Sequence, residues 1–223
     1  TTSVLVTMPD TDDLDTAPII YLLHGLTDNC TGWARYTQAE HLARTHSAIL
    51  IMPEVQRSFY TDMLRAKVFH LRQPGIASDG APLFWHSPQP GPNVHHGAFY
   101  GRLWCAEMCL TAPQQYAGAA GFSSVADIKA KLRRSAAGMR IRLCSVAAFA
   151  PEGDLFALAT RFTDGTQKGR MPEVFLACGQ QDGLFADNLR LRDHLRGMDW
   201  PLTWYDAPGD HNWFFWNDAL QEQ

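Results

Sequence analysis

Short apolar runs alternate with amphipathic segments along this chain. Residues 17–25, APIIYLLHG, are apolar until they end in glycine, and residues 46–54, HSAILIMPE, repeat the pattern. Runs of this kind are typical of strands buried on both faces of a parallel sheet. The intervening residues 32–45 carry apolar side chains near helical spacing, at Trp33, Tyr36 and Leu42. The pattern therefore predicts a strand, a helix and a second strand.

The C-terminal third continues this alternation. Residues 172–179, PEVFLACG, predict a third buried strand, and residues 201–213, PLTWYDAPGDHNW, predict a strand that runs into a loop. Between them, residues 185–197 predict an amphipathic helix that ends at Gly197. This order indicates the α/β class, with a mostly parallel sheet and helices on both faces. Because no repeat or low-complexity linker interrupts it, we expect residues 1–223 to form a single domain.

Three loops follow the predicted strands, where chemistry gathers in sheets of this class. In HGLTDN, residues 24–29, a tight glycine turn can point backbone N–H groups at a substrate oxygen. The alternative is an ordinary turn without a catalytic role, which is compatible with the same sequence. Asp182 lies in CGQQDG and His211 in APGDHNW, where a plain turn aspartate and a surface histidine are the alternatives. An acid followed by a histidine, each beyond a strand, is the late half of the α/β-hydrolase order of nucleophile, acid and base.

Four segments resemble the S-formylglutathione hydrolase, esterase D and tributyrin esterase group of the α/β-hydrolases. They are PIIYLLHGLTDNCTGW, MPEVQRSFYTDM, LACGQQDGLFADNLRLRDHL and APGDHNWFFW. The resemblance implies the α/β-hydrolase fold and hydrolysis of short acyl esters or thioesters by a serine nucleophile, without a cofactor. It also implies that Gly25 and Leu26, beside His24, form the oxyanion hole, that Asp182 is the triad acid and that His211 is the general base.

The same resemblance implies a serine in a Gly-x-Ser-x-Gly elbow between Met63 and Gln115, and this sequence has none there. Residues 64–109 hold five of the thirteen prolines and only two acids, Asp79 and Glu107. A helix followed by a buried strand does not have such a composition.

A reading frame shifted by one nucleotide accounts for this segment. Codons taken across the junctions of residues 97–109 can spell GLSMGGYGALKCA, which contains the expected elbow. We therefore expect about residues 64–110 to be out of frame, with the nucleophilic serine encoded at the Phe99 and Tyr100 codons. The chain as read then has no nucleophile, and we expect it to be inactive or poorly folded.

The sequence also allows other nucleophiles and other classes of protein. Ser123 in GFSSV lies two residues after a glycine, as in the elbow, but Val125 replaces the second glycine. Cys178 is typical of a buried small side chain. A metal-binding module around His95 and His96 has Cys105 as a further ligand type but no fourth ligand at zinc spacing. A non-catalytic relative or pseudogene product is another alternative. Residues 139–150 match the group poorly, and the ends of the chain fit a shortened protein.

The composition of the chain limits the kinds of partner that we expect. The net charge of −4 and the lack of a long basic run argue against nucleic acid. No apolar run approaches the roughly 18 residues of a membrane span, and no signal peptide is evident. Five cysteines without paired spacing suit a reducing compartment. We therefore expect a cytoplasmic protein, without a metal or a membrane partner, that acts on a small acyl ester or thioester; a homo-oligomer is an open alternative.

Overall fold

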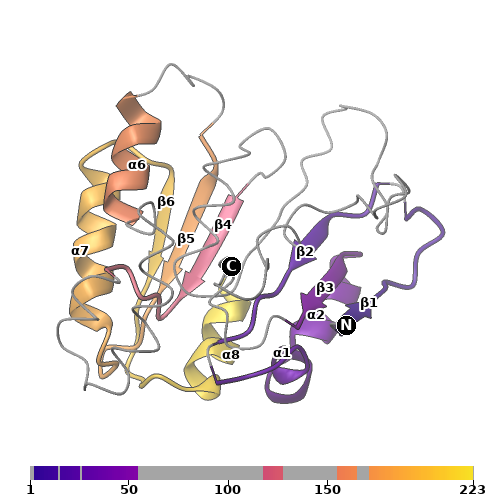
Figure 1. The fold of residues 1–223 in the computed structure, drawn as a ribbon. Coiled ribbons are helices and arrows are strands. Elements are labelled where there is room, and N and C mark those ends of the chain that lie inside the picture. Colours follow the sequence, from indigo (N-terminus) through magenta and orange to yellow (C-terminus); the bar gives the residue numbers. More distant parts are fainter. Residues whose placement is uncertain are drawn as a thin grey trace, which may run out of the picture.

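The computed structural model describes residues 3–14, 16–25, 27–54, 118–127, 155–164 and 171–222. The predictions for residues 64–110, including the shifted frame and the His95 and His96 site, and for residues 139–150 lie outside these. In chain order the described elements are β1 (Val4–Thr7), β2 (Ile19–Tyr21), α1 (Gly32–Tyr36), α2 (Ala39–Thr45), β3 (Ile49–Pro53), β4 (Gly118–Phe122), α6 (Leu155–Asp164), β5 (Glu173–Ala177), α7 (Phe185–Arg196), β6 (Leu202–Tyr205) and α8 (Trp213–Gln221) (Figure 1).

The strands form two three-stranded sheets, in the orders β1-β3-β2 and β4-β5-β6. Strands β2 and β3 are parallel, with Ile20 opposite Leu50, and β5 is parallel to both β4 and β6. Only the β1 and β3 pair is antiparallel among the described strands. The prediction of a mostly parallel α/β arrangement is confirmed, and β2, β3, β5 and β6 lie within the runs that predicted them.

Strand β4 has a sequence, GAAGF, that did not suggest a strand, because it lacks β-branched residues. Its small residues match close neighbours: a Cβ at Gly118 would lie 2.8 Å from the carbonyl oxygen of Glu173, and one at Gly121 would lie 3.0 Å from Leu176 Cδ2. Four of its five residues are buried, so both faces of the strand are covered. Within the described residues, β4 is the end strand of the β4-β5-β6 sheet, and its small residues let β5 approach closely.

The helices partly differ from the prediction. The single helix expected over residues 32–45 is two helices, because Thr37 adopts an extended conformation and its hydroxyl donates to the carbonyl of Trp33 at 2.6 Å. Helix α7 covers the predicted residues, and Gly197 ends it. Gly197 is the C-cap residue of this helix and has a φ of −64°.

Helices cover both faces of the β4-β5-β6 sheet, as expected (Figure 1). On one face, α6 and α7 contribute Phe162 and Leu191 to a core with Val174 and Leu176 of β5. On the other, α8 packs against Phe175 of β5, in a core that also receives buried side chains from α1, α2 and β3. The second core therefore joins the two sheets into one hydrophobic interior.

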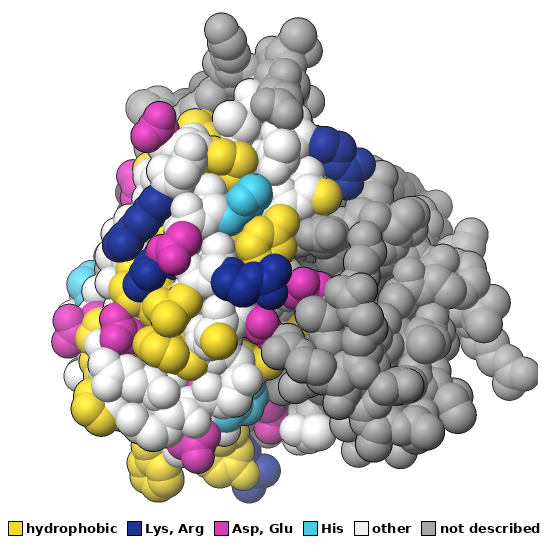
Figure 2. Space-filling view, turned by 90° about the vertical axis from the view of Figure 1, so that its left-hand side faces the viewer, with side chains coloured by type: hydrophobic (Ala, Val, Ile, Leu, Met, Phe, Trp, Pro, Cys, Tyr) yellow, Lys and Arg dark blue, Asp and Glu magenta, His cyan; other side chains and the backbone are white. Residues whose placement is uncertain are grey.

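The outer face of α6 and α7 carries charges of both signs. In Figure 2 the described acidic and basic side chains on this face are interspersed, and no large area has a single sign. Arg190, for example, lies 3.5 Å from Asp187 and 3.6 Å from Asp127. This part of the surface does not have the basic patch that nucleic-acid binding needs. Within the described residues, no helix has both the length and the apolar character to cross a membrane.

Candidate active site

Two loops meet beyond the carboxyl ends of β5 and β6, and they carry the predicted acid and base. The backbone N–H of Gln180 donates to the carbonyl of Ala207 at 3.0 Å, and that of Gln181 donates to the carbonyl of Gly209 at 2.9 Å. Gly179 permits this approach, because a Cβ there would lie 2.6 Å from the carbonyl carbon of Gly209. The loops are thus joined backbone to backbone, which fixes the positions of Asp182 and His211.

Asp182 and His211 are in direct contact. His211 Nδ1 lies 2.8 Å from Asp182 Oδ2. The side chain of Asp182 is 1% exposed and that of His211 is 30% exposed, so a buried acid stands behind an accessible imidazole. The backbone N–H of Leu184 donates to the other carboxylate oxygen, Oδ1, at 2.8 Å. Both oxygens of Asp182 are therefore held in place.

The charge of Asp182 fixes the tautomer of His211. Burial on its own would raise the pKa of Asp182, but hydrogen bonds from His211, the Ser123 hydroxyl and the Leu184 N–H outweigh it, and the pKa is lowered. Asp182 is therefore ionised at neutral pH and can only accept hydrogen bonds. The proton of neutral His211 must then lie on Nδ1, which makes Nε2 the basic nitrogen of the ring.

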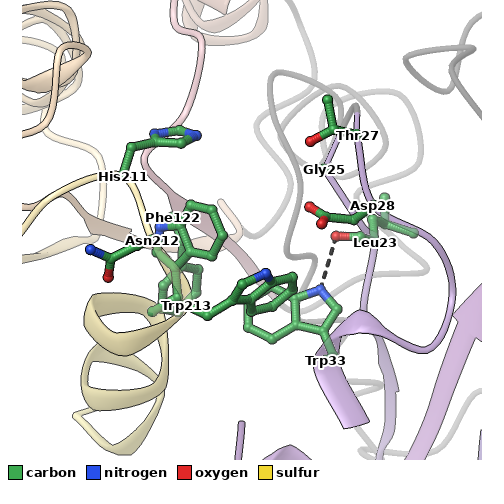
Figure 3. Close-up of a pocket in the computed structure, with 10 residues that line it drawn as sticks. Leu23, Gly25, Thr27, Asp28, Trp33, Phe122, His211, Asn212 and Trp213 are labelled. Atoms are coloured by element: carbon green, nitrogen blue, oxygen red, sulfur yellow. Dashed lines mark hydrogen bonds between the residues drawn. The ribbon is translucent and has the colours of Figure 1, made fainter. Parts of the chain in front are cut away.

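A cavity of about 260 Å³ lies beside His211 (Figure 3). Thr27 and Asp28, from the loop after β2, stand across it from His211, and Gly25 of the same loop also lines it. Gly25 is thus at the cavity, where the oxyanion prediction requires it. Leu26, the other residue of that prediction, lies outside the described residues.

Glu54 supports the loop that carries Gly25. His24 is 2% exposed, and its Nδ1 lies 2.8 Å from the carbonyl oxygen of Gly25 while its Nε2 lies 3.4 Å from Glu54 Oε1. The other oxygen of Glu54 accepts the backbone N–H of Cys30 at 3.0 Å. One carboxylate at the end of β3 therefore contacts both ends of the loop. The sequence offered only its position directly after a buried strand, and this contact was not predicted.

Comparisons with known proteins bear on the fold of the chain. No family model matches the chain. A curated acetyl esterase of Caldicellulosiruptor saccharolyticus is 24% identical over 226 residues, which cover 95% of this chain and 82% of that protein. The solved S-formylglutathione hydrolase of Staphylococcus aureus has a TM-score of 0.76 at 23% identity, over 99% of this chain and 90% of that one. An S-formylglutathione hydrolase of Agrobacterium tumefaciens has a TM-score of 0.74 at 15% identity, over 99% and 87%.

This chain has the α/β-hydrolase fold. The fold predicted from the sequence is confirmed, as is the resemblance to S-formylglutathione hydrolases and esterases. In this α/β-hydrolase fold, the Asp182 and His211 loops follow adjacent parallel strands, and the Gly25 loop follows the end strand of the other sheet.

Aromatic side chains form much of the cavity in this hydrolase fold. Trp33 donates its Nε1–H to the carbonyl of Leu23 at 3.1 Å (Figure 3), and Trp216 donates its own to the Ser123 hydroxyl at 3.1 Å. The ring centroid of Trp213 lies 5.0 Å from that of each of these two indoles, in edge-to-face contacts. In the run NWFFWND, Trp213 and Trp216 line the cavity, whereas Phe215 is buried.

Ser123 and Cys178, the two alternative nucleophiles, lie behind Asp182. Ser123 is 0% exposed, has a φ of 49°, and engages Trp216 and Asp182 with its hydroxyl. Cys178 is also fully buried, and burial together with the charge of Asp182 raises its pKa to about 12. A hidden hydroxyl and a protonated thiol do not fit the role of a nucleophile. Both residues instead pack around the acid.

The described residues contain no group of three or more His, Cys, Asp or Glu side chains that could hold a metal ion. The alternative site around His95 and His96 lies outside those residues. Free thiols in the described part belong to Cys30 and Cys178.

Proposed function

We propose that this chain is a serine carboxylesterase or thioesterase of short acyl esters, with Asp182 and His211 as the acid and base of its triad. The observation that carries the proposal is the 2.8 Å contact between His211 Nδ1 and Asp182 Oδ2 beside a cavity that Gly25 also lines. Relatives named as acetyl esterase and S-formylglutathione hydrolase support this class of carboxylic ester hydrolase. The cavity volume of about 260 Å³ suits a small acyl group. The cytoplasm is the proposed location, and no cofactor is required.

The nucleophile is proposed to be the serine encoded in the shifted frame at the Phe99 and Tyr100 codons. These codons fall between β3 and β4 in the chain. A strand placed between β2 and β4 would convert the orders β1-β3-β2 and β4-β5-β6 into one continuous sheet. Its carboxyl end would then lie between the Gly25 loop and the Asp182 loop, which is where a triad needs its serine.

In the frame-restored protein, the serine oxygen attacks the acyl carbonyl while His211 Nε2 accepts the hydroxyl proton. Asp182 keeps the Nδ1 proton in place and stabilises the imidazolium that forms. Backbone N–H groups at Gly25 and Leu26 donate to the carbonyl oxygen as it becomes negative. The imidazolium then gives its proton to the leaving alcohol or thiol, and the acyl group stays on the serine. Water, deprotonated by His211, releases the acid and regenerates the serine.

Hydrolysis of p-nitrophenyl acetate tests the proposal in two proteins. The frame-restored protein is expected to hydrolyse this ester, and His211→Ala is expected to lower the rate about 10⁴-fold to 10⁶-fold, as removal of triad members does elsewhere. The chain as read should show only the background rate. A frame-restored protein whose hydrolysis is unchanged in His211→Ala would disprove the assigned roles. Hydrolysis by the chain as read that depends on His211 would disprove the missing nucleophile.

A further inference from the structure

The cavity beside His211 contains one carboxylate, that of Asp28. Asp28 is partly buried and lines the cavity, and no Lys or Arg is among the described lining residues. Its carboxylate has no hydrogen bond or ion pair with the described residues. A partly buried negative charge favours a positively charged ligand and disfavours an anionic one.

Aromatic rings share the cavity with this charge. Trp33, Trp213, Trp216 and Phe122 all line the same cavity. Trp213 and Asp28 belong to the same part of it, because a Cβ at Gly32 would lie 3.0 Å from Trp213 Cζ2 and 3.8 Å from Asp28 Cβ. Indole rings attract cations more strongly than the other aromatic side chains do.

These rings are also fixed before any ligand binds. The indole N–H groups of Trp33 and Trp216 are each used in a hydrogen bond at 3.1 Å, to Leu23 and Ser123. Trp213 lies in edge-to-face contact with both indoles. A preformed aromatic site loses little conformational entropy when a ligand enters, so the attraction for a cation is not spent on ordering the rings.

We propose that this cavity binds a quaternary ammonium group, with Trp213 and its neighbouring rings as the aromatic surface and Asp28 as the counter-charge. Four alkyl substituents leave such a cation with no N–H to donate, so it needs ring faces and a nearby charge more than hydrogen-bond acceptors. This cavity supplies aromatic rings and one carboxylate, beside the polar side chains of Thr27, His211 and Asn212. If the proposed hydrolase function also holds, the substrates are acyl esters of a quaternary amino alcohol.

Isothermal titration of the chain as read compares choline with 3,3-dimethylbutan-1-ol, which has nearly the same shape but no charge. Choline is expected to bind about tenfold more tightly, a ratio that corresponds to about 1.4 kcal/mol. Asp28→Asn is expected to reduce this ratio to about twofold or less. Asp12→Asn, at an exposed acid outside the cavity, should leave the ratio unchanged.

A second pair of variants tests the rings. Trp213→Leu is expected to weaken choline binding about fivefold or more. Phe214→Leu is the control, because Phe214 is the next residue of α8 but is 84% exposed and does not line the cavity. Equal affinities for choline and its neutral analogue, or a ratio unaffected by Asp28→Asn, would overturn the proposal. Circular dichroism of each variant shows whether a loss of binding reflects loss of the fold.

Separate outcomes would contradict the ammonium-site proposal and the esterase proposal. In the frame-restored protein, kcat/KM for butyrylcholine is expected to exceed that for 3,3-dimethylbutyl butyrate by about tenfold. Equal hydrolysis of both esters contradicts the ammonium site and leaves the esterase proposal intact. Selective choline binding by a frame-restored protein that hydrolyses no ester supports the ammonium site and contradicts the esterase proposal.

Discussion

Replacing Gly179 by alanine is expected to separate the loop that carries Asp182 from the loop that carries His211. A Cβ at Gly179 would lie 2.6 Å from the carbonyl carbon of Gly209 and 3.1 Å from the backbone nitrogen of Asp210. Both are backbone atoms, so no side-chain rotation can relieve the overlap. The loops must therefore move apart by roughly 1 Å to restore ordinary contact distances of about 3.5 to 4.0 Å.

The cost follows from the contacts that such a movement breaks. The backbone hydrogen bonds from Gln180 to Ala207 and from Gln181 to Gly209, at 3.0 and 2.9 Å, would lengthen beyond hydrogen-bonding range. Two lost hydrogen bonds at about 1 kcal/mol each, with about 1 to 2 kcal/mol of overpacking, give about 3 to 4 kcal/mol of lost stability. In the frame-restored protein, a displacement of this size at His211 should also lower kcat/KM about 10²-fold.

Urea unfolding of Gly179→Ala and Gly183→Ala measures this effect with a matched control. Gly183 lies in the same loop, but a Cβ there would meet nothing within 4 Å. We expect the first variant to lose about 3 kcal/mol and the second less than about 0.5 kcal/mol, as surface substitutions usually do. If the two variants unfold at the same urea concentration, the close approach of the loops does not hold the pair together.

Two further predictions concern the surroundings of the acid. Because hydrogen bonds lower the pKa of Asp182, its ionised form adds stability at pH values above about 3.9, the usual pKa of an unfolded aspartate, and this stability is lost as the pH falls through the lower folded pKa. The difference in unfolding free energy between the parent and Asp182→Asn should therefore shrink as the pH falls from 6 to 3, and a difference that grows would contradict the assignment. Cys178 is fully buried with a pKa raised to about 12, so iodoacetamide at pH 8 followed by peptide mass spectrometry should find it alkylated only after unfolding.

Sequence patterns predicted the elements in which local and tertiary preferences agree. The run ILIMP of β3 is apolar and rich in strand-forming residues, and four of its five side chains are buried. The GAAGF run of β4 was missed because its reason for being a strand is the close approach of Glu173 and Leu176, which no local pattern reveals. The helix break at Thr37 likewise depends on one hydroxyl donating to the Trp33 carbonyl.

The candidate site likewise has one part that the sequence predicted and one part that it did not. The order of Asp182 and His211 after successive strands predicted that they belong together, and their side chains lie 2.8 Å apart. Asp28 and the Trp213 ring were not predicted to share a cavity, because Asp28 lies after β2 and Trp213 opens α8. Their proximity depends on α8 packing against the first half of the chain. Long-range contacts of this kind produce no regular spacing of residues in the sequence from which they could be predicted.

The nucleotide sequence of the gene across codons 60 to 112 tests the central claim most directly. We predict that the bases there, read one position out of the present frame, spell the Gly-x-Ser-x-Gly elbow, with its serine across the Phe99 and Tyr100 codons. Small deletions should mark both ends of the shifted segment. Bases that encode no serine at this position in the shifted frame would contradict the claim that the acid and base of this fold have lost their nucleophile to a change of frame.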